Sequence, residues 1–276
     1  MRYLGISRAE PFSPNRVEGD AAVFRAVAAE LERNGNMVTC MTEEELVRRG
    51  IPQGTDGIFQ MARSREALAV LGQADVPVTN TVQAVLNCGR ASQTRILLDS
   101  GLIPDSVICP TAGVVEVRDS YPCWIKRADC HATERDDVRF LRDAAECAAA
   151  IRGFAGRGIK ECVLQNHVRG WLVKFYGVRG FGLTDYRAAT AKEGKFGLER
   201  FNDRPEQACV DVEDLTSAAE RASELLGVEI YGGDAVVSPE GKVTVVDMND
   251  WPSFRTCTVG AARKIAELIM SKRDEG

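Results

Sequence analysis

Two acidic residues and one amide in the last fifth of the chain have the types and spacing of a metal site. The segment VTVVDMND (243–250) has the pattern of a buried strand, and it ends with Asp247 and Asn249 two positions apart. Asp234 lies in the preceding apolar run, and the sequence SPEG between the two runs is typical of a hairpin turn. Alternate side chains of a strand point to one face, so Asp247 and Asn249 share a face. The pattern therefore predicts oxygen ligands gathered on one face of a hairpin.

The register of this hairpin decides whether Asp234 joins the other two residues. If Ser238 and Gly241 close the turn, Asp234 lies opposite Val245 and points to the face of the two later ligands. Its Cα atom is then a diagonal neighbour of Asp247, about 7 to 8 Å away, and two carboxylates so close need a cation to compensate them. Oxygen-only ligands favour Mg²⁺ or Mn²⁺. A shift of one residue would turn Asp234 to the other face, and the alternative interpretation is a set of solvated residues at a strand end.

The elements that must position this hairpin alternate between strands and helices, as in α/β proteins. Residues 2–6, 37–41, 57–61 and 76–80 have the composition of strands, and 19–34 has the pattern of an amphipathic helix. We therefore expect an N-terminal βαβ unit of about eighty residues, whose ligands would bind at the carboxyl ends of its strands.

The rest of the chain predicts two further layers of strands and helices. A helix is expected over 81–100, then a short strand that ends in Lys126, and then a helix over 137–151. The segments ECVLQNHV, WLVKFYGV and GLTDYRAAT are expected to form one antiparallel sheet. A helix over 212–226 is expected before the hairpin in sequence, and another over 257–272 after it.

Composition and charge exclude several classes of protein. A net charge of −5 leaves no basic excess that would attract nucleic acid. The nine cysteines are odd in number and never spaced Cys-x-x-Cys, which indicates reduced thiols and excludes a disulfide framework or a cysteine zinc site. No apolar run has the length of a signal peptide or a membrane span. We therefore expect a cytoplasmic protein with neither nucleic acid nor a membrane as a partner.

The order of the motifs resembles the ATP-grasp superfamily. The N-terminal βαβ unit is followed by the lysine of CWIK, the segment VLQNHV, and then GGDAVV and VVDMNDWP, and the resemblance is strongest from Thr79 to Phe254. The order and spacing of these motifs together carry the resemblance. The resemblance implies an α/β chain with the ATP-grasp fold, divided into an N-terminal α/β domain over 1–80, a central lobe over 81–160 and a C-terminal lobe with the metal site over 161–276.

The resemblance also implies ATP and Mg²⁺ (or Mn²⁺) as cofactors and assigns residues to them. The residues implied to bind the nucleotide are Lys126, His131, Gln165, Asn166, His167, Val168 and Lys174. The implied metal ligands are Asp234, Asp247 and Asn249. Lys174 and Arg187 match basic residues that neutralise phosphate or an acyl-phosphate transition state, and solvated outer-face positions are the alternative for both. Arg90 and Arg95 both lie near the position of a further family lysine.

Two chemistries divide the superfamily. A resemblance to ribosomal-protein glutamate ligases and glutathione synthetases implies an ADP-forming ligase, in which a small carboxylic acid becomes an acyl phosphate and an amine or thiol displaces the phosphate. The segments QNHVRGWLVKFYGV and DMNDWPSF also resemble inositol polyphosphate kinases, which is the alternative. The mixed charge of residues 127–137 favours a ligase, since a polyphosphate substrate would need many basic side chains. Relatives commonly form homodimers.

A second alternative is a nucleotide-binding protein that has lost catalysis. Asp247 stands where many relatives have glutamate, Asn166 replaces another glutamate, and the loop RADCHATERDDV replaces a loop rich in glycine and serine. The retention of Lys126 together with Asp234, Asp247 and Asn249 opposes this alternative, because folding alone does not need that set.

Overall fold

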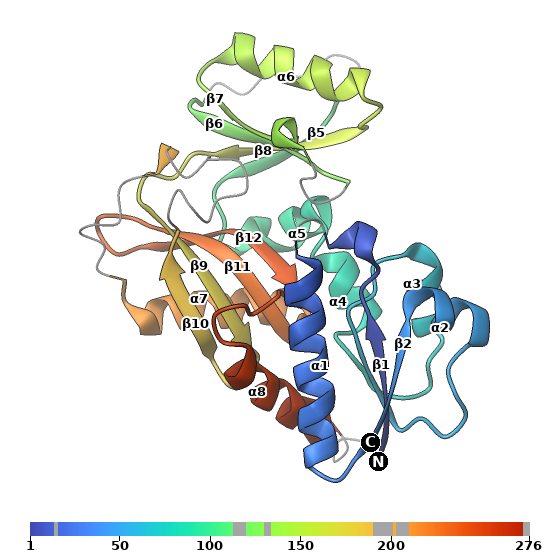
Figure 1. Cartoon of the computed structure of the whole chain (residues 1–276). Coiled ribbons are helices and arrows are strands. Elements are labelled where there is room, and N and C mark those ends of the chain that lie inside the picture. The colour runs from blue at the N-terminus through green and yellow to red at the C-terminus, as the bar shows by residue number, and fades with distance from the viewer. Residues whose placement is uncertain (14–15, 113–119, 130–133, 190–200, 203–209, 273–276) are drawn as a thin grey trace.

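The computed structural model describes residues 1–13, 16–112, 120–129, 134–189, 201–202 and 210–272. In these residues the strands form three four-stranded sheets, and helices pack against each of them (Figure 1). No helix within these described ranges has the length and apolar character needed to cross a membrane.

The first sheet is parallel, with the strand order β2-β1-β3-β4. Its strands are β1 (Arg2–Ser7), β2 (Met37–Thr42), β3 (Gly57–Gln60) and β4 (Val78–Thr79). Its helices are the 3-10 turn η1 (Glu10–Phe12), α1 (Val17–Arg33), α2 (Glu43–Arg49) and α3 (Arg65–Leu71). Local signals start two of these helices, because Thr42 forms a capping box with Glu45 and the Ser64 side chain accepts a hydrogen bond from the Ala67 amide.

The second sheet is antiparallel, with the order β5-β8-β6-β7. The elements of this part are α4 (Val82–Asn87), α5 (Arg90–Leu97), η2 (Leu98–Ser100), β5 (Ser106–Pro110), β6 (Cys123–Arg127), η3 (Arg135–Asp137), β7 (Val138–Leu141), α6 (Ala144–Gly156) and β8 (Glu161–Asn166). One face of the sheet is buried under α6, where Ile151 and Phe154 pack with Ile125 and Leu164. The other face points toward the third sheet (Figure 1).

Two predicted helices differ in the structure. The helix expected over 137–151 begins only at Ala144, because the side chain of Asp143 caps it by accepting a hydrogen bond from the Glu146 amide. The residues before it form the strand β7, in which Val138 and Phe140 are two positions apart and point to the same face. The single helix expected over 81–100 is divided after Asn87 into α4 and α5, which is followed by η2.

The third sheet is antiparallel, with the order β10-β9-β11-β12. Its elements are β9 (Trp171–Val178), β10 (Leu183–Ala188), α7 (Val212–Leu226), β11 (Ile230–Val237), β12 (Val243–Asp250) and α8 (Thr258–Ser271). One face is buried under α7, where Leu215 and Ala222 pack with Phe175, Val245 and Met248. Residues of the opposite alternation are therefore on the face away from α7.

The expected antiparallel sheet of three consecutive strands is wrong, because β8 belongs to the second sheet and β9 and β10 to the third. Gly170 lies between β8 and β9 with φ +146°, a conformation that side chains rarely allow. A Cβ atom there would also lie 2.2 Å from the carbonyl oxygen of Val237. A glycine at this position therefore lets the chain pass from one sheet to the other.

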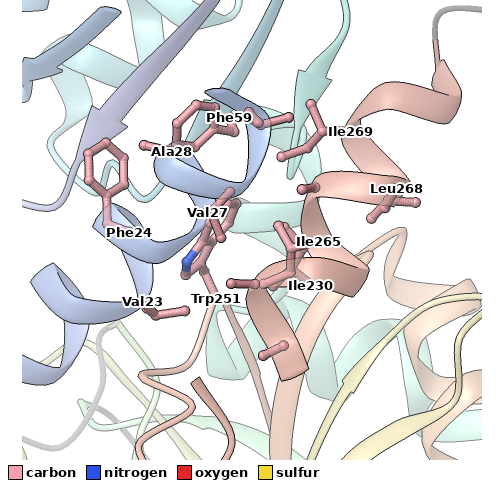
Figure 2. Close-up of a cluster of buried hydrophobic side chains, with 14 of the residues drawn as sticks. Val23, Phe24, Val27, Ala28, Phe59, Ile230, Trp251, Ile265, Leu268 and Ile269 are labelled. Carbon is pink, nitrogen blue, oxygen red and sulfur yellow. The ribbon is translucent and has the colours of Figure 1, made fainter. Parts of the chain in front are cut away.

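The segment after β12 anchors the third sheet to the N-terminal unit. Trp251 is fully buried beside Val23 and Val27 of α1 and Ile265 of α8 (Figure 2). Its ring stacks on Phe59 with the centroids 6.3 Å apart. Its φ of 40° costs about 1–3 kcal/mol, which burial of the large ring offsets. The hairpin and the N-terminal sheet therefore share one core.

Candidate nucleotide and metal site

A row of four charged residues crosses the third sheet from one edge to the other. Arg187 of β10 pairs with Lys174 of β9, Lys174 pairs with Asp234 of β11, and Asp234 pairs with Asp247 of β12. Directly opposed residues in antiparallel strands point to one face, so all four lie on the face away from α7. Two positive charges therefore stand beside two negative charges, with a formal sum of zero.

The hairpin that supplies the acidic half of this row has a different register from the expected one. The Ser238 amide donates to the Lys242 carbonyl, 3.0 Å apart, so Lys242 and not Gly241 closes the turn. Continued without interruption, this register would place Val246 opposite Asp234. Asp247 and Asn249 would then point to the α7 face.

A β-bulge at Val246 restores the face that the sequence predicted. The register shifts by one residue at this point, so that Asp234 lies directly opposite Asp247 and Gly232 opposite Asn249. The expected pairing of Asp234 with Val245 is therefore wrong, whereas the three proposed ligands still share a face.

The side chains of the proposed ligands form two pairs, one between Lys174 and Asp234 and one between Asn249 and Asp247. Lys174 Nζ lies 2.8 Å from Asp234 Oδ1, and Asn249 Nδ2 donates to Asp247 Oδ2 at 3.2 Å. Burial lowers the pKa of Lys174, but Asp234, together with Tyr176 and Asp247, raises it overall, so this side chain stays an ammonium.

The chemistry of this set fits Mg²⁺ or Mn²⁺, which take carboxylate and amide oxygens. No cluster of three or more His, Cys, Asp or Glu side chains is placed to hold a metal within the residues that the structure describes. A divalent cation at Asp234, Asp247 and Asn249 would thus complete its coordination with nucleotide or water oxygens.

Lys126 joins the second sheet to the bulged hairpin. Its Nζ donates to Gln165 Oε1 at 2.8 Å and to the carbonyl oxygen of the bulge residue Val246 at 2.9 Å. Burial, with a smaller contribution from Arg90, lowers the pKa of Lys126 to about 8, against the opposing influence of Asp247 and Asp234. The structure thus places this lysine beside the acidic residues of the third sheet.

The residues expected to contact the base lie at the end of β8 and just after it. Gln165 binds Lys126 through its oxygen, while the Asn166 side chain donates to Asp105 Oδ2 at 3.4 Å. Val168 is half-buried just beyond the strand. His131 lies outside the described residues.

A group of four aromatic side chains beside these residues was not predicted from the sequence. It consists of Trp124, Phe140, His167 and Phe201, with neighbouring ring centroids 4.3 to 6.2 Å apart. Trp124 Nε1 donates to His167 Nδ1 at 3.2 Å. Trp124 is two residues from Lys126 on β6, so both point to the face that α6 does not cover. That spacing was the signal available in the sequence.

The structure shows which of Arg90 and Arg95 lies near Lys126, a question that the sequence leaves open. Arg90 is buried at the start of α5, donates to the Arg127 carbonyl, and is close enough to lower the pKa of Lys126. Arg95 is exposed and pairs with Glu161. Arg90 is therefore the arginine that lies at the site.

Arg187 is held at its end of the row by an aromatic ring. Its guanidinium carbon lies 5.8 Å from the centroid of the Tyr176 ring, and its Nη2 donates to the Tyr176 hydroxyl at 3.3 Å. The guanidinium is thus held on the same face as Lys174.

No family model matches the sequence, and no curated protein matches it. Solved structures do match, over nearly the whole chain. The D-alanine–D-alanine ligase from Bacillus anthracis complexed with ATP superposes with a TM-score of 0.72 and 14% identity, covering 100% of both chains. The RimK domain ATP-grasp protein from Sphaerobacter thermophilus gives 0.66 and 19%, covering 97% of this chain and 99% of that one.

A third structure, the D-alanine–D-alanine ligase from Coxiella burnetii, gives a TM-score of 0.70 and 11% identity, covering 100% of this chain and 97% of that one. These likenesses show that the chain has the ATP-grasp fold. The fold class predicted from the order of the motifs is therefore confirmed.

Proposed function

We propose that the chain is an ADP-forming ligase, which uses ATP to activate a small carboxylic acid as an acyl phosphate and then joins it to an amine or a thiol. The observation that carries the proposal is the row of Arg187, Lys174, Asp234 and Asp247, which meets Lys126 at the bulge of the hairpin. The ATP-grasp fold and the ligases among its structural neighbours support the same chemistry.

Each part of the site has a role in this proposal. Lys126 and Arg90 bind phosphate oxygens, and the group of Trp124, Phe140, His167 and Phe201 receives the base. Asp234, Asp247 and Asn249 would hold Mg²⁺ or Mn²⁺, which when bound stabilises the negative charge of the phosphates.

The basic half of the row acts on the transferred group. Lys174 and Arg187 offset the charge that develops on the phosphoryl group and on the acyl phosphate. Because Asp234 already pairs with Lys174 and Asp247 lies next to it, the row has no surplus positive charge for a polyphosphate substrate. This balance favours a carboxylic acid as the acceptor.

The test is incubation with ATP, Mg²⁺ and pools of carboxylic acids, amines, thiols and polyols. A ligase releases phosphate only when an acid is present together with an amine or a thiol, and hydroxylamine in place of that nucleophile traps the acyl phosphate as a hydroxamate. A phosphorylated hydroxyl product would instead identify a small-molecule kinase. Nucleotide binding without any turnover would identify a protein that has lost catalysis.

Nucleotide binding is expected to depend on the charge of Lys126. Its pKa in the folded chain is lowered to about 8, so the ammonium is present below that pH and is lost as the pH rises through it. ADP affinity, measured by titration calorimetry without metal, should fall about tenfold between pH 7 and pH 9. The Lys126→Arg variant should show a flat profile, because a guanidinium keeps its charge. A wild-type affinity that is equal at both pH values would contradict this role.

A further inference from the structure

The strand that carries two of the proposed metal ligands lies at the edge of its sheet. β12 pairs with β11 on one side only, and edge strands present a row of backbone groups without a neighbouring strand. Here that row is occupied by other groups. The Val245 amide donates to the Leu102 carbonyl at 2.8 Å, and the Val246 carbonyl accepts from Lys126 Nζ at 2.9 Å.

Further along this edge, a single side chain binds the backbone of Met248. Gln93 of α5 is 6% exposed, and its Nε2 donates to the Met248 carbonyl oxygen at 2.7 Å. Its Oε1 accepts from the Met248 amide at 3.2 Å. One carboxamide therefore binds both backbone groups of one residue, as a neighbouring strand would. Met248 stands between Asp247 and Asn249.

We propose that Gln93 is a positioning residue of the metal site, an inference that rests on the proposed function. Without its carboxamide, the two buried backbone groups of Met248 lose their partners, at a cost of about 1–3 kcal/mol each. The strand can recover those hydrogen bonds only by moving, and Asp247 and Asn249 move with it.

The helix that carries Gln93 also carries a cation of the site. Arg90 precedes Gln93 by three residues, so the two side chains lie on neighbouring positions of one helix face. Arg90 lies close to Lys126, whereas Gln93 binds β12, the strand that carries Asp247 and Asn249. α5 thus fixes the distance between the phosphate-binding cations and the carboxylates.

The test measures metal affinity in the full chain carrying Gln93→Leu. We expect this variant to bind Mn²⁺ about tenfold more weakly than the wild type in the presence of ADP. The electron paramagnetic resonance signal of free Mn²⁺ measures the binding. Metal-free ADP affinity should stay unchanged, since both ends of the Gln93 carboxamide bind the backbone of Met248, which has no proposed role in nucleotide binding. Gln93→Asn, which is one methylene too short for both bonds, should weaken Mn²⁺ binding in the same direction and guards against a variant that fails to fold.

Ser223→Ala is the matched control. The Ser223 hydroxyl is fully buried in α7 and donates to the Val228 carbonyl at 2.7 Å, so its loss removes a buried hydrogen bond without touching β12. This variant should lose stability and keep its Mn²⁺ affinity. Wild-type Mn²⁺ affinity in a folded Gln93 variant, or an equal loss in Ser223→Ala, would overturn the positioning role alone. A wild-type chain that binds ADP but no Mn²⁺ would overturn the metal site and the role of Gln93 together.

Discussion

Replacing Asp247 with alanine should reduce ATP turnover about a thousandfold or more, which corresponds to about 4 kcal/mol of transition-state stabilisation. Asp247 is one of only two carboxylates among the three proposed ligands, and it lies directly opposite the other one. Its loss removes charge that a divalent cation needs, while Asp234 remains engaged with Lys174. The rate of ADP release at saturating ATP and Mg²⁺ measures the effect.

The thermal midpoint of the Asp247 variant should stay close to that of the wild type, because the side chain is only half-buried. Glu224→Ala is the control for the loss of an acid, since Glu224 lies on the surface of α7 and pairs with Arg221. It should turn over at the wild-type rate. Turnover of the Asp247 variant within tenfold of the wild type would show that this carboxylate does not hold the cation.

Replacing Arg63 with leucine should lower the free energy of unfolding by about 3–5 kcal/mol. Arg63 Nη2 lies 2.6 Å from Asp250 Oδ1, and the Asp250 side chain is 1% exposed. The other carboxylate oxygen of Asp250 is buried without a hydrogen-bond partner, so the carboxylate depends on Arg63 for compensation. Chemical denaturation followed by tryptophan fluorescence measures the change.

Two further variants show whether the loss of stability comes from breaking a buried ion pair or merely from removing an arginine. Arg95→Leu removes an arginine whose pair with Glu161 is about half exposed, and it should cost less than about 1 kcal/mol. Adding Asp250→Leu to Arg63→Leu should recover much of the loss, since the Asp250 carboxylate is then no longer left buried without Arg63. An Arg63 variant as stable as the Arg95 variant would show that the buried pair of Arg63 and Asp250 does not stabilise the fold in this way.

The sequence predicted the face of the ligands but not the way in which the structure achieves it. The alternation in VTVVDMND and the turn SPEG indicate a hairpin, and an uninterrupted ladder with the turn closed by Gly241 gives the observed face. The actual turn is one residue longer, and the bulge at Val246 compensates for it. Nothing in an apolar run marks which residue will bulge, because that choice depends on contacts such as the one from Lys126.

Other parts of the site depend on contacts between residues far apart in the chain. Gln93 and Met248 are separated by 155 positions, and no local pattern connects them. Phe140 was assigned to a helix, so its position opposite Trp124 on a strand could not be anticipated. By contrast, Lys126 could be located from the short apolar strand to which it belongs and from the order of the motifs.

The most direct test of the central claim is a crystal of the chain grown with a non-hydrolysable ATP analogue and Mn²⁺, measured for the anomalous signal of manganese. The account predicts an anomalous peak about 2.2 Å from oxygens of Asp234, Asp247 or Asn249 and from a phosphate oxygen of the analogue. A nucleotide bound elsewhere, or bound beside Lys126 with no manganese among these three residues, would contradict it.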